Sequence, residues 1–223
     1  MDTQNILLLI ITGINFVLAA TIYFRNYRGH VNIAFGLTIF AAATWTFEIY
    51  MFRSVTDLNQ AIIWAKAFYL TANLIALFFL FFAISFPYPI FTSLTKRLLI
   101  IFPTIIIVVL VFIPHVIVED VVIQTWGKEV RLNSGYFIYI AYFISYVIWA
   151  YSILLKKFLK SEGIIRDQLK YTIFGTIIGF IFGTIFDLLL PLFGNYKLIS
   201  IGPYFTVFAS FFIYYFVFFK KYN

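Results

Sequence analysis

Seven long apolar runs, separated by short polar or proline-containing segments, constrain this chain more than any other feature of its sequence. A helix needs about 20 mostly apolar residues to cross the hydrocarbon core of a bilayer. Because 63% of the residues are hydrophobic and only 11% are charged, no segment is polar enough to fold separately in water. The sequence therefore predicts one all-α domain over residues 1–223, an integral membrane seven-helix bundle. The expected spans are residues 6–24, 32–52, 61–86, 98–113, 135–155, 170–190 and 198–219.

Prolines and charges set the limits of these spans. Pro87 follows the third run and Pro114 the fourth, where a missing backbone donor stops a helix. Pro103 lies inside the fourth run, so a bundle of six spans is the alternative if this run does not cross. The first run follows Asp2 and no basic residue, which disfavours a secretory signal peptide.

Residues 114–134 form the longest loop between two runs. Valine-rich segments flank Gly127, which predicts a small hairpin over the helix ends with this glycine in its turn. An unstructured loop is the alternative.

The basic residues indicate how the bundle is oriented. Lys and Arg concentrate in the cytoplasmic loops of membrane proteins. The side of the bundle with more basic residues is therefore predicted to be cytoplasmic. This places the N-terminus outside and the C-terminus in the cytoplasm, an arrangement that requires an odd number of spans. The net charge of +7 follows from this topology, and no nucleic-acid partner is expected. One side of the predicted bundle holds eleven basic residues, Arg25, Arg28, Lys96, Arg97, Lys156, Lys157, Lys160, Arg166, Lys170, Lys220 and Lys221, and the other holds five, Arg53, Lys66, Lys128, Arg131 and Lys197.

Three ionisable residues, Glu48, Lys66 and Asp187, lie inside the apolar runs. An ionisable side chain at the centre of a span costs about 2.5–3.5 kcal/mol, so each needs a partner, a cavity or a path to the interface. Each lies a few residues from the outer end of its span, which places all three roughly 5–8 Å below the outer surface. They are therefore candidates for one ligand pocket in the outer leaflet. Small polar and aromatic neighbours, Tyr69, Asn73 and Thr44, are added to this candidate site because they share helix faces with Lys66 or Glu48.

Two other interpretations of these residues stay open. Glu48 and Lys66 could form a structural ion pair between neighbouring helices, or reach the interface by snorkelling. The three residues could instead belong to a proton or ion path. A pocket with two carboxyl groups and one ammonium group would suit a small ligand that carries an amine or several hydrogen-bond donors, unless an acid is held protonated.

Glycine recurs every four residues in the sixth run, at Gly175, Gly179 and Gly183. Without a hydrophobic driving force between helices in lipid, small residues that allow close backbone approach favour association. We expect this stripe to pack against the seventh span, which a short link joins to the sixth. Asn15 in the first span is expected to hydrogen-bond to another helix.

Several function classes find little support in the sequence. Cysteine is absent and the two histidines are expected on opposite sides of the membrane, so neither a metal site nor a cofactor is predicted. No nucleophile and base pair is evident, and an enzyme is not expected. The seventh run lacks the lysine that a retinal Schiff base needs. A small transporter and a non-sensory scaffold or dimerisation subunit remain as alternatives.

The sequence resembles the N-terminal seven-transmembrane sensor region of bacterial histidine kinases along nearly its whole length. The segment from Arg166 to Tyr222, with LLLP after Asp187 and Gly202-Pro203 near the start of the last run, is similar to the last two helices of that family. RNYRGHVNIAFGLTIFAAATWTFEIYMF and AIIWAKAFYL are similar to its second and third helices, and YFIYIAYFISYVIWAYSILL to its fifth.

The resemblance implies a membrane-embedded input module of a two-component system in the bacterial cytoplasmic (inner) membrane. A small ligand of unknown identity would be bound, and the last helix would pass the change to a kinase-type output domain or partner protein, with homodimerisation left open. Such regions usually continue into a kinase or cyclase region. This sequence is therefore expected to be the sensor part of a longer receptor or a stand-alone member. Asp187 stands where the family commonly has an amide, so the ligand type is not carried over.

Overall fold

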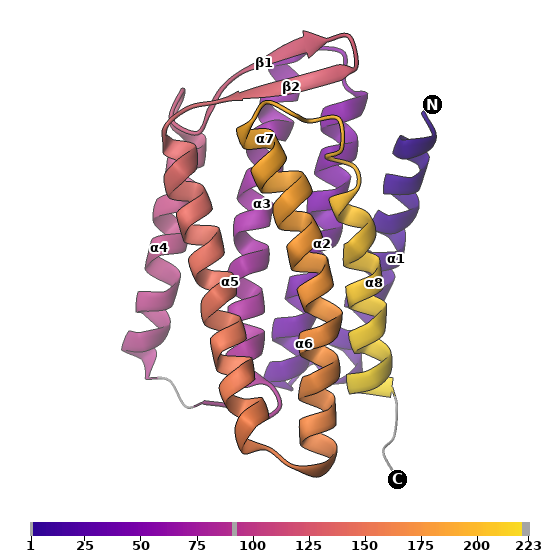
Figure 1. Ribbon diagram of the computed structural model, residues 1–223, viewed down its shortest axis with the longest axis vertical. Helices are drawn as coiled ribbons and strands as arrows, with labels where there is room; N and C mark the ends of the chain where they lie inside the picture. The colour runs from indigo at the N-terminus through magenta and orange to yellow at the C-terminus, as the bar shows by residue number, and fades with distance from the viewer. Residues whose placement is uncertain (1, 91–92, 220–223) are drawn as a thin grey trace.

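The computed structural model describes residues 2–90 and 93–219, and this part of the chain forms seven helices that are long and apolar enough to cross a membrane (Figure 1). The predicted all-α seven-helix bundle is confirmed, and the proline-containing fourth run forms a full helix of its own. Lys220 and Lys221 lie outside the described residues. The spans are α1 (Thr3–Arg25), α2 (His30–Ser54), α3 (Leu58–Ser85), α4 (Leu94–Phe112), α5 (Gly135–Lys160), a sixth that begins as α6 (Gly163–Gly183) and a seventh that begins as α8 (Gly202–Ile213).

Two of the spans, α3 and α4, begin at a side chain that caps the helix. Asp57 accepts a hydrogen bond from the backbone N–H of Asn59 at 3.0 Å, and Ser93 accepts one from Lys96 at 3.4 Å. The last span begins at Gly202 and not at the start of its apolar run, because Pro203 suits the first turn of a helix. The apolar runs thus located the helices but not their ends.

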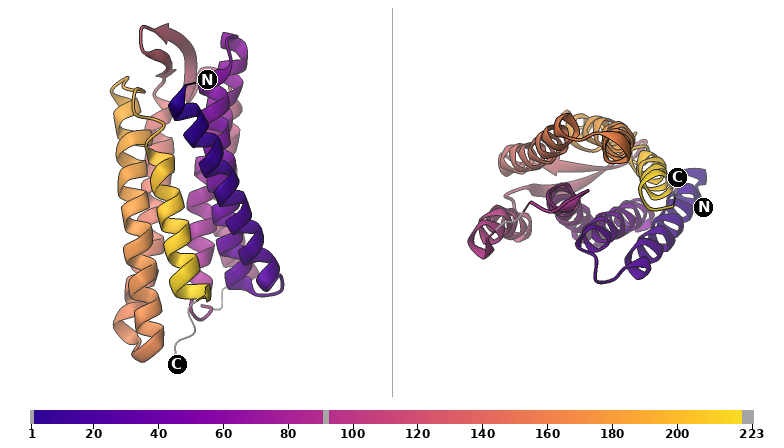
Figure 2. Two further views of the ribbon diagram at one scale, coloured as in Figure 1. Left: turned by 90° about the vertical axis from the view of Figure 1, so that its right-hand side faces the viewer. Right: turned by 90° about the horizontal axis from the view of Figure 1, so that it is seen from below.

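Seen along its long axis, the bundle is an elongated ring (Figure 2). One wall consists of α1, α2 and α3, the opposite wall consists of α5, α6 and α8, and α1 meets α8 to close one end. The α4 helix lies at the other end of the ring, largely on the outside. The predicted contact between helices from Asn15 is confirmed, since its Nδ2 donates to Thr206 Oγ1 at 3.0 Å and joins α1 to α8.

A β-hairpin, β1 (Val118–Gln124) and β2 (Gly127–Leu132), covers one end of the bundle (Figure 1). The predicted hairpin is confirmed, but Gly127 follows the two turn residues 125–126 and begins β2, with a φ of 141°. The Lys128 ammonium donates to the carbonyls of Phe52 and Arg53, each at 3.0 Å, so it caps the end of α2. Burial, together with the Arg53 charge, lowers the pKa of Lys128.

Two helices change their winding near their ends. The α6 helix continues as a π-helical turn, η1 (Thr184–Leu189), followed by α7 (Leu190–Leu192), while α8 continues as η2 (Tyr214–Phe219). A π-turn adds a residue to the helical repeat and is frequent at functional sites. The first of these turns holds Asp187.

Candidate functional site

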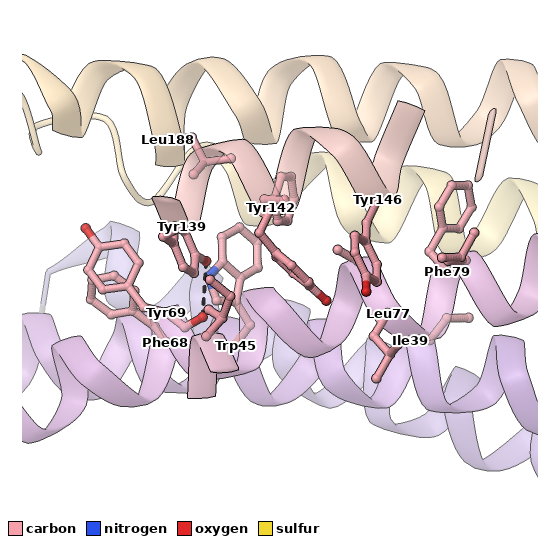
Figure 3. Close-up of a cluster of buried hydrophobic side chains, with 14 of the residues drawn as sticks. Ile39, Trp45, Phe68, Tyr69, Leu77, Phe79, Tyr139, Tyr142, Tyr146 and Leu188 are labelled. Atoms are coloured by element: carbon pink, nitrogen blue, oxygen red, sulfur yellow. Dashed lines mark hydrogen bonds between the residues drawn. The ribbon is translucent and has the colours of Figure 1, made fainter. Parts of the chain in front are cut away.

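A cavity of about 110 Å³ lies inside the ring, between the α2–α3 wall and the wall formed by α5, α6 and α8. Its lining is mostly aliphatic and aromatic, with Trp45 and Ile39 from α2 and Phe79 from α3. Figure 3 shows these side chains in the same buried cluster as Tyr69 and Tyr139. A largely apolar pocket with a few polar groups is the usual form of a small-molecule site.

Asp187 supplies the charged group of this lining. Both of its carboxyl oxygens are buried, and neither has a hydrogen-bond partner among the described residues. The carboxyl group lies directly over Gly202 at the start of α8, where a Cβ would come within 1.6 Å of Oδ2. A buried carboxyl group without a partner is costly in the folded protein, so this group is free to accept hydrogen bonds from a ligand.

Four buried tyrosines meet beside Asp187 and fix the backbone around it. The hydroxyl groups of Tyr69 and Tyr196 lie 2.9 Å apart, and the Tyr139 hydroxyl donates to the Tyr69 carbonyl at 3.1 Å, as Figure 3 shows. Tyr136 donates to the carbonyl of Leu188 at 3.0 Å, within the π-turn. The Tyr136 bond therefore holds the π-turn against α5, while the other two bonds join α3 to α5 and to the link that contains Tyr196.

Of the six residues predicted for a ligand site, Asp187 and Tyr69 line the cavity and four do not. Glu48 faces α3, where its Oε1 accepts a hydrogen bond from Thr71 at 2.9 Å, although its Oε2 is buried without a partner. Lys66 faces α4 and donates to the Phe112 carbonyl at 3.4 Å. Glu48 and Lys66, both in the described part of the chain, do not form an ion pair with each other.

The other two predicted residues make local or interhelical hydrogen bonds. Asn73 is fully buried and donates from Nδ2 to the Thr104 carbonyl of α4 at 3.4 Å. Thr44 donates to the Phe40 carbonyl of its own helix at 3.0 Å. Neither side chain therefore faces Asp187.

The glycine stripe of α6 serves two surfaces. A Cβ on Gly175 would lie 2.8 Å from Phe212 Cδ1, and one on Gly179 would lie 3.4 Å from the Cβ of Ala209, so both face α8. A Cβ on Gly183 would meet nothing within 4 Å. Gly183 therefore faces only the cavity, next to the π-turn, whereas Gly179 both contacts α8 and borders the cavity.

The sequence reasoning missed Tyr136, Tyr139 and Tyr196. A signal for the first two was present, because Tyr136, Tyr139, Tyr142 and Tyr146 recur every three or four residues along the fifth run. That spacing places them on one helix face. Tyr196 lies in the turn between α7 and α8, where no periodic pattern marks it.

Comparison with protein families identifies the chain. Residues 7–221 of the 223 match the N-terminal 7TM region of histidine kinase. No match was found among curated proteins. The match spans all seven helices, the hairpin and the π-turn with Asp187. The chain therefore belongs to the family of N-terminal seven-transmembrane regions of histidine kinases.

Proposed function

We propose that this chain is a sensory input module that binds a small, largely apolar ligand in the cavity beside Asp187. The ligand carries a hydrogen-bond donor, an amine or a hydroxyl group, that the Asp187 carboxyl group accepts. Aromatic side chains such as Trp45 and Phe79 contact its apolar part. The chain itself performs no catalysis in this proposal.

The observation that carries the proposal is the unpartnered carboxyl group of Asp187 on an otherwise mostly apolar cavity wall. A donor from a ligand would remove the cost of burying this group, and that gain would exist only when the ligand is bound. The π-turn and the Tyr136 bond to Leu188 support a defined position for the carboxyl group before the ligand arrives.

The same cavity suggests how binding reaches the end of the chain. Its lining includes Gly179 and Gly183 of the sixth span and Ala209 and Ile213 of the seventh. A ligand would contact both helices where they pack on each other, and a ligand can shift an equilibrium only through such differential contacts. We infer that binding changes the packing of α8 on α6 and moves η2, which leads toward the output domain or partner.

The proposal includes an orientation in the membrane. Among the described residues, nine basic side chains lie at the end of the bundle opposite the hairpin: Arg25, Arg28, Lys96, Arg97, Lys156, Lys157, Lys160, Arg166 and Lys170. Five lie at the hairpin end or near it. This excess supports a cytoplasmic position for the end where η2 stops, in a bacterial inner membrane. The signal would then enter near the outer face.

A chimera that carries a kinase output domain tests the site. Asp187→Leu removes every acceptor and should abolish the response to the native signal, because the donor of the ligand loses its partner. Asp187→Asn keeps an acceptor but removes the charge. Loss of the response in Asp187→Asn would indicate a cationic amine, and a retained response would indicate a neutral donor.

Glu48→Gln is the matched control, since it changes a buried carboxyl group that does not line the cavity. It should leave the response intact. Normal signalling by Asp187→Leu at an unchanged membrane level would rule out the proposed site. Mass spectrometry of small molecules that copurify with the unmodified chain, but not with Asp187→Leu, would identify the ligand.

A further inference from the structure

A second cleft, of about 600 Å³, lies between α4 and α5 at the end of the bundle away from the hairpin. Its lining combines two kinds of side chain. Lys96, Lys156 and Lys160 provide ammonium groups, while residues such as Leu99 and Ile153 provide an apolar wall. It shares no lining residue with the cavity beside Asp187.

The cleft exists because α4 is attached to the bundle above it. Tyr146 donates to the Ile100 carbonyl at 2.5 Å, and the hydroxyl groups of Tyr142 and Thr104 lie 2.7 Å apart. These bonds join α4 to α5 near Pro103. Toward its first residues α4 is highly exposed, with Leu99 66% accessible, so the cleft opens toward the surrounding lipid.

Lys157 closes the inner side of the cleft, and its ammonium group is not available to a ligand there. Its buried ammonium group donates to the carbonyls of Ala83, Ile84, Phe86 and Tyr88 at 2.7–2.9 Å, and thereby caps the end of α3. The other lysines of the cleft, Lys96, Lys156 and Lys160, do not cap a helix in this way. All three are exposed, and in the described part of the chain their ammonium groups have neither a hydrogen bond nor an ion pair with an acidic residue.

We propose that this cleft binds an anionic phospholipid, with the phosphate at Lys96, Lys156 and Lys160 and an acyl chain along Leu99 and Ile153. Three unpaired ammonium groups match a negative head group, since each basic residue near a membrane surface contributes about 1 kcal/mol toward anionic lipid. The apolar wall open to the bilayer matches an acyl chain. Trp149, which is 45% exposed and also lines the cleft, has the amphipathic ring found at the interface.

Native mass spectrometry of the full chain in detergent, with equal amounts of phosphatidylglycerol and phosphatidylcholine, tests this proposal. The unmodified chain should retain phosphatidylglycerol in preference. Replacing Lys96, Lys156 and Lys160 by Gln should reduce this preference by about fivefold per lysine. Because the three side chains are exposed, thermal unfolding of the triple variant should match that of the unmodified chain.

The matched control replaces Arg25, Arg28 and Lys170 by Gln, which removes the same charge from the same end of the bundle but outside the cleft. It should keep the preference. An equal loss in both triple variants would show a general effect of surface charge and overturn the site, as would no preference in the unmodified chain.

Two further measurements separate a lipid from a free phosphate compound. An excess of glycerol phosphate should not displace the bound lipid, because it lacks the acyl chain. Complete displacement would overturn the lipid and leave a phosphate site. Leu99→Trp should weaken phosphatidylglycerol binding with all lysines present, and unchanged binding by this variant would overturn the placement of the acyl chain.

Discussion

The contact between Asp187 and Gly202 limits what residue 202 can be. A Cβ at this position would lie 1.6 Å from Asp187 Oδ2 and 2.6 Å from its Cγ, and side-chain atoms essentially never approach a Cβ within 3.0 Å. Any side chain at residue 202 must therefore push the carboxyl group away from the start of α8. A glycine beside a buried acid is thus part of the site, although it carries no chemistry itself.

Gly202→Ala should lower the free energy of unfolding by about 1–3 kcal/mol, the usual cost of overpacking a well-packed position. It should also reduce the signalling response, because Asp187 can no longer keep its place. Thermal unfolding of the purified variant checks the first effect. In the double variant Gly202→Ala, Asp187→Ala the stability cost should largely disappear.

Gly13→Ala is the control for this experiment, since a Cβ at Gly13 would meet nothing within 4 Å. It should be neutral or slightly stabilising, because alanine favours a helix over glycine by about 1 kcal/mol. If Gly202→Ala were as harmless as Gly13→Ala, the described position of the Asp187 carboxyl group would be wrong.

At the scale of helices, the sixth span packs on the seventh, α8 and its continuation η2, through two glycines and through aromatic stacking on either side of them. Phe182 stacks on Phe205 with ring centroids 4.0 Å apart, and Tyr171 stacks on Phe216 at 4.2 Å. Gly175 and Gly179 allow the approach that brings these rings together. The two helices therefore pack along most of their length, and a ligand between them would disturb an extended contact.

Substitutions at Gly179 and Gly183 should have different effects, one on the stability of the fold and the other on the signalling response. Gly179→Ile places a branched side chain against the Cβ of Ala209 and should lower the thermal stability and the yield of folded protein. Gly183→Leu points into the cavity, so it should leave the fold intact but occupy ligand space and reduce the response. Thermal unfolding and the kinase chimera measure the two effects. Equal thermal stability of the two variants would contradict the closer contact of Gly179 with α8.

The helices were predictable from sequence because each apolar run has the length that a membrane requires. The π-turn at residues 184–189 was not. A π-turn depends on contacts that stabilise an extra residue in the helical repeat. Here that contact is the Tyr136 bond to the Leu188 carbonyl, and no local sequence pattern specifies it. The tyrosines on α5 could have been found from their spacing, but the partner of each could not.

At the scale of the whole molecule, the position of a residue along its span was predictable and the direction that it faces was not. Glu48, Lys66 and Asp187 lie in the spans at distances from the hairpin end that can be counted in residues. The direction that each one faces depends on how its helix is turned, and they face α3, α4 and the cavity respectively. Only the packing of all seven helices determines which polar residues share a space. For this reason only one of the three ionisable residues predicted to share a pocket, Asp187, lies on the cavity wall.

The orientation of the whole bundle can be tested by cysteine labelling, because the chain contains no cysteine of its own. Gln124→Cys places a thiol on the hairpin, and Glu162→Cys places one in the exposed link between α5 and α6 at the opposite end. In right-side-out membrane vesicles, a membrane-impermeant maleimide should label Gln124→Cys at once. It should label Glu162→Cys only after the vesicles are opened, because an excess of basic residues at one end of a bundle favours a cytoplasmic position for that end. The reverse pattern would place the hairpin and the Asp187 end of the cavity on the cytoplasmic side, where an external signal would have to cross the membrane before it could reach the carboxyl group.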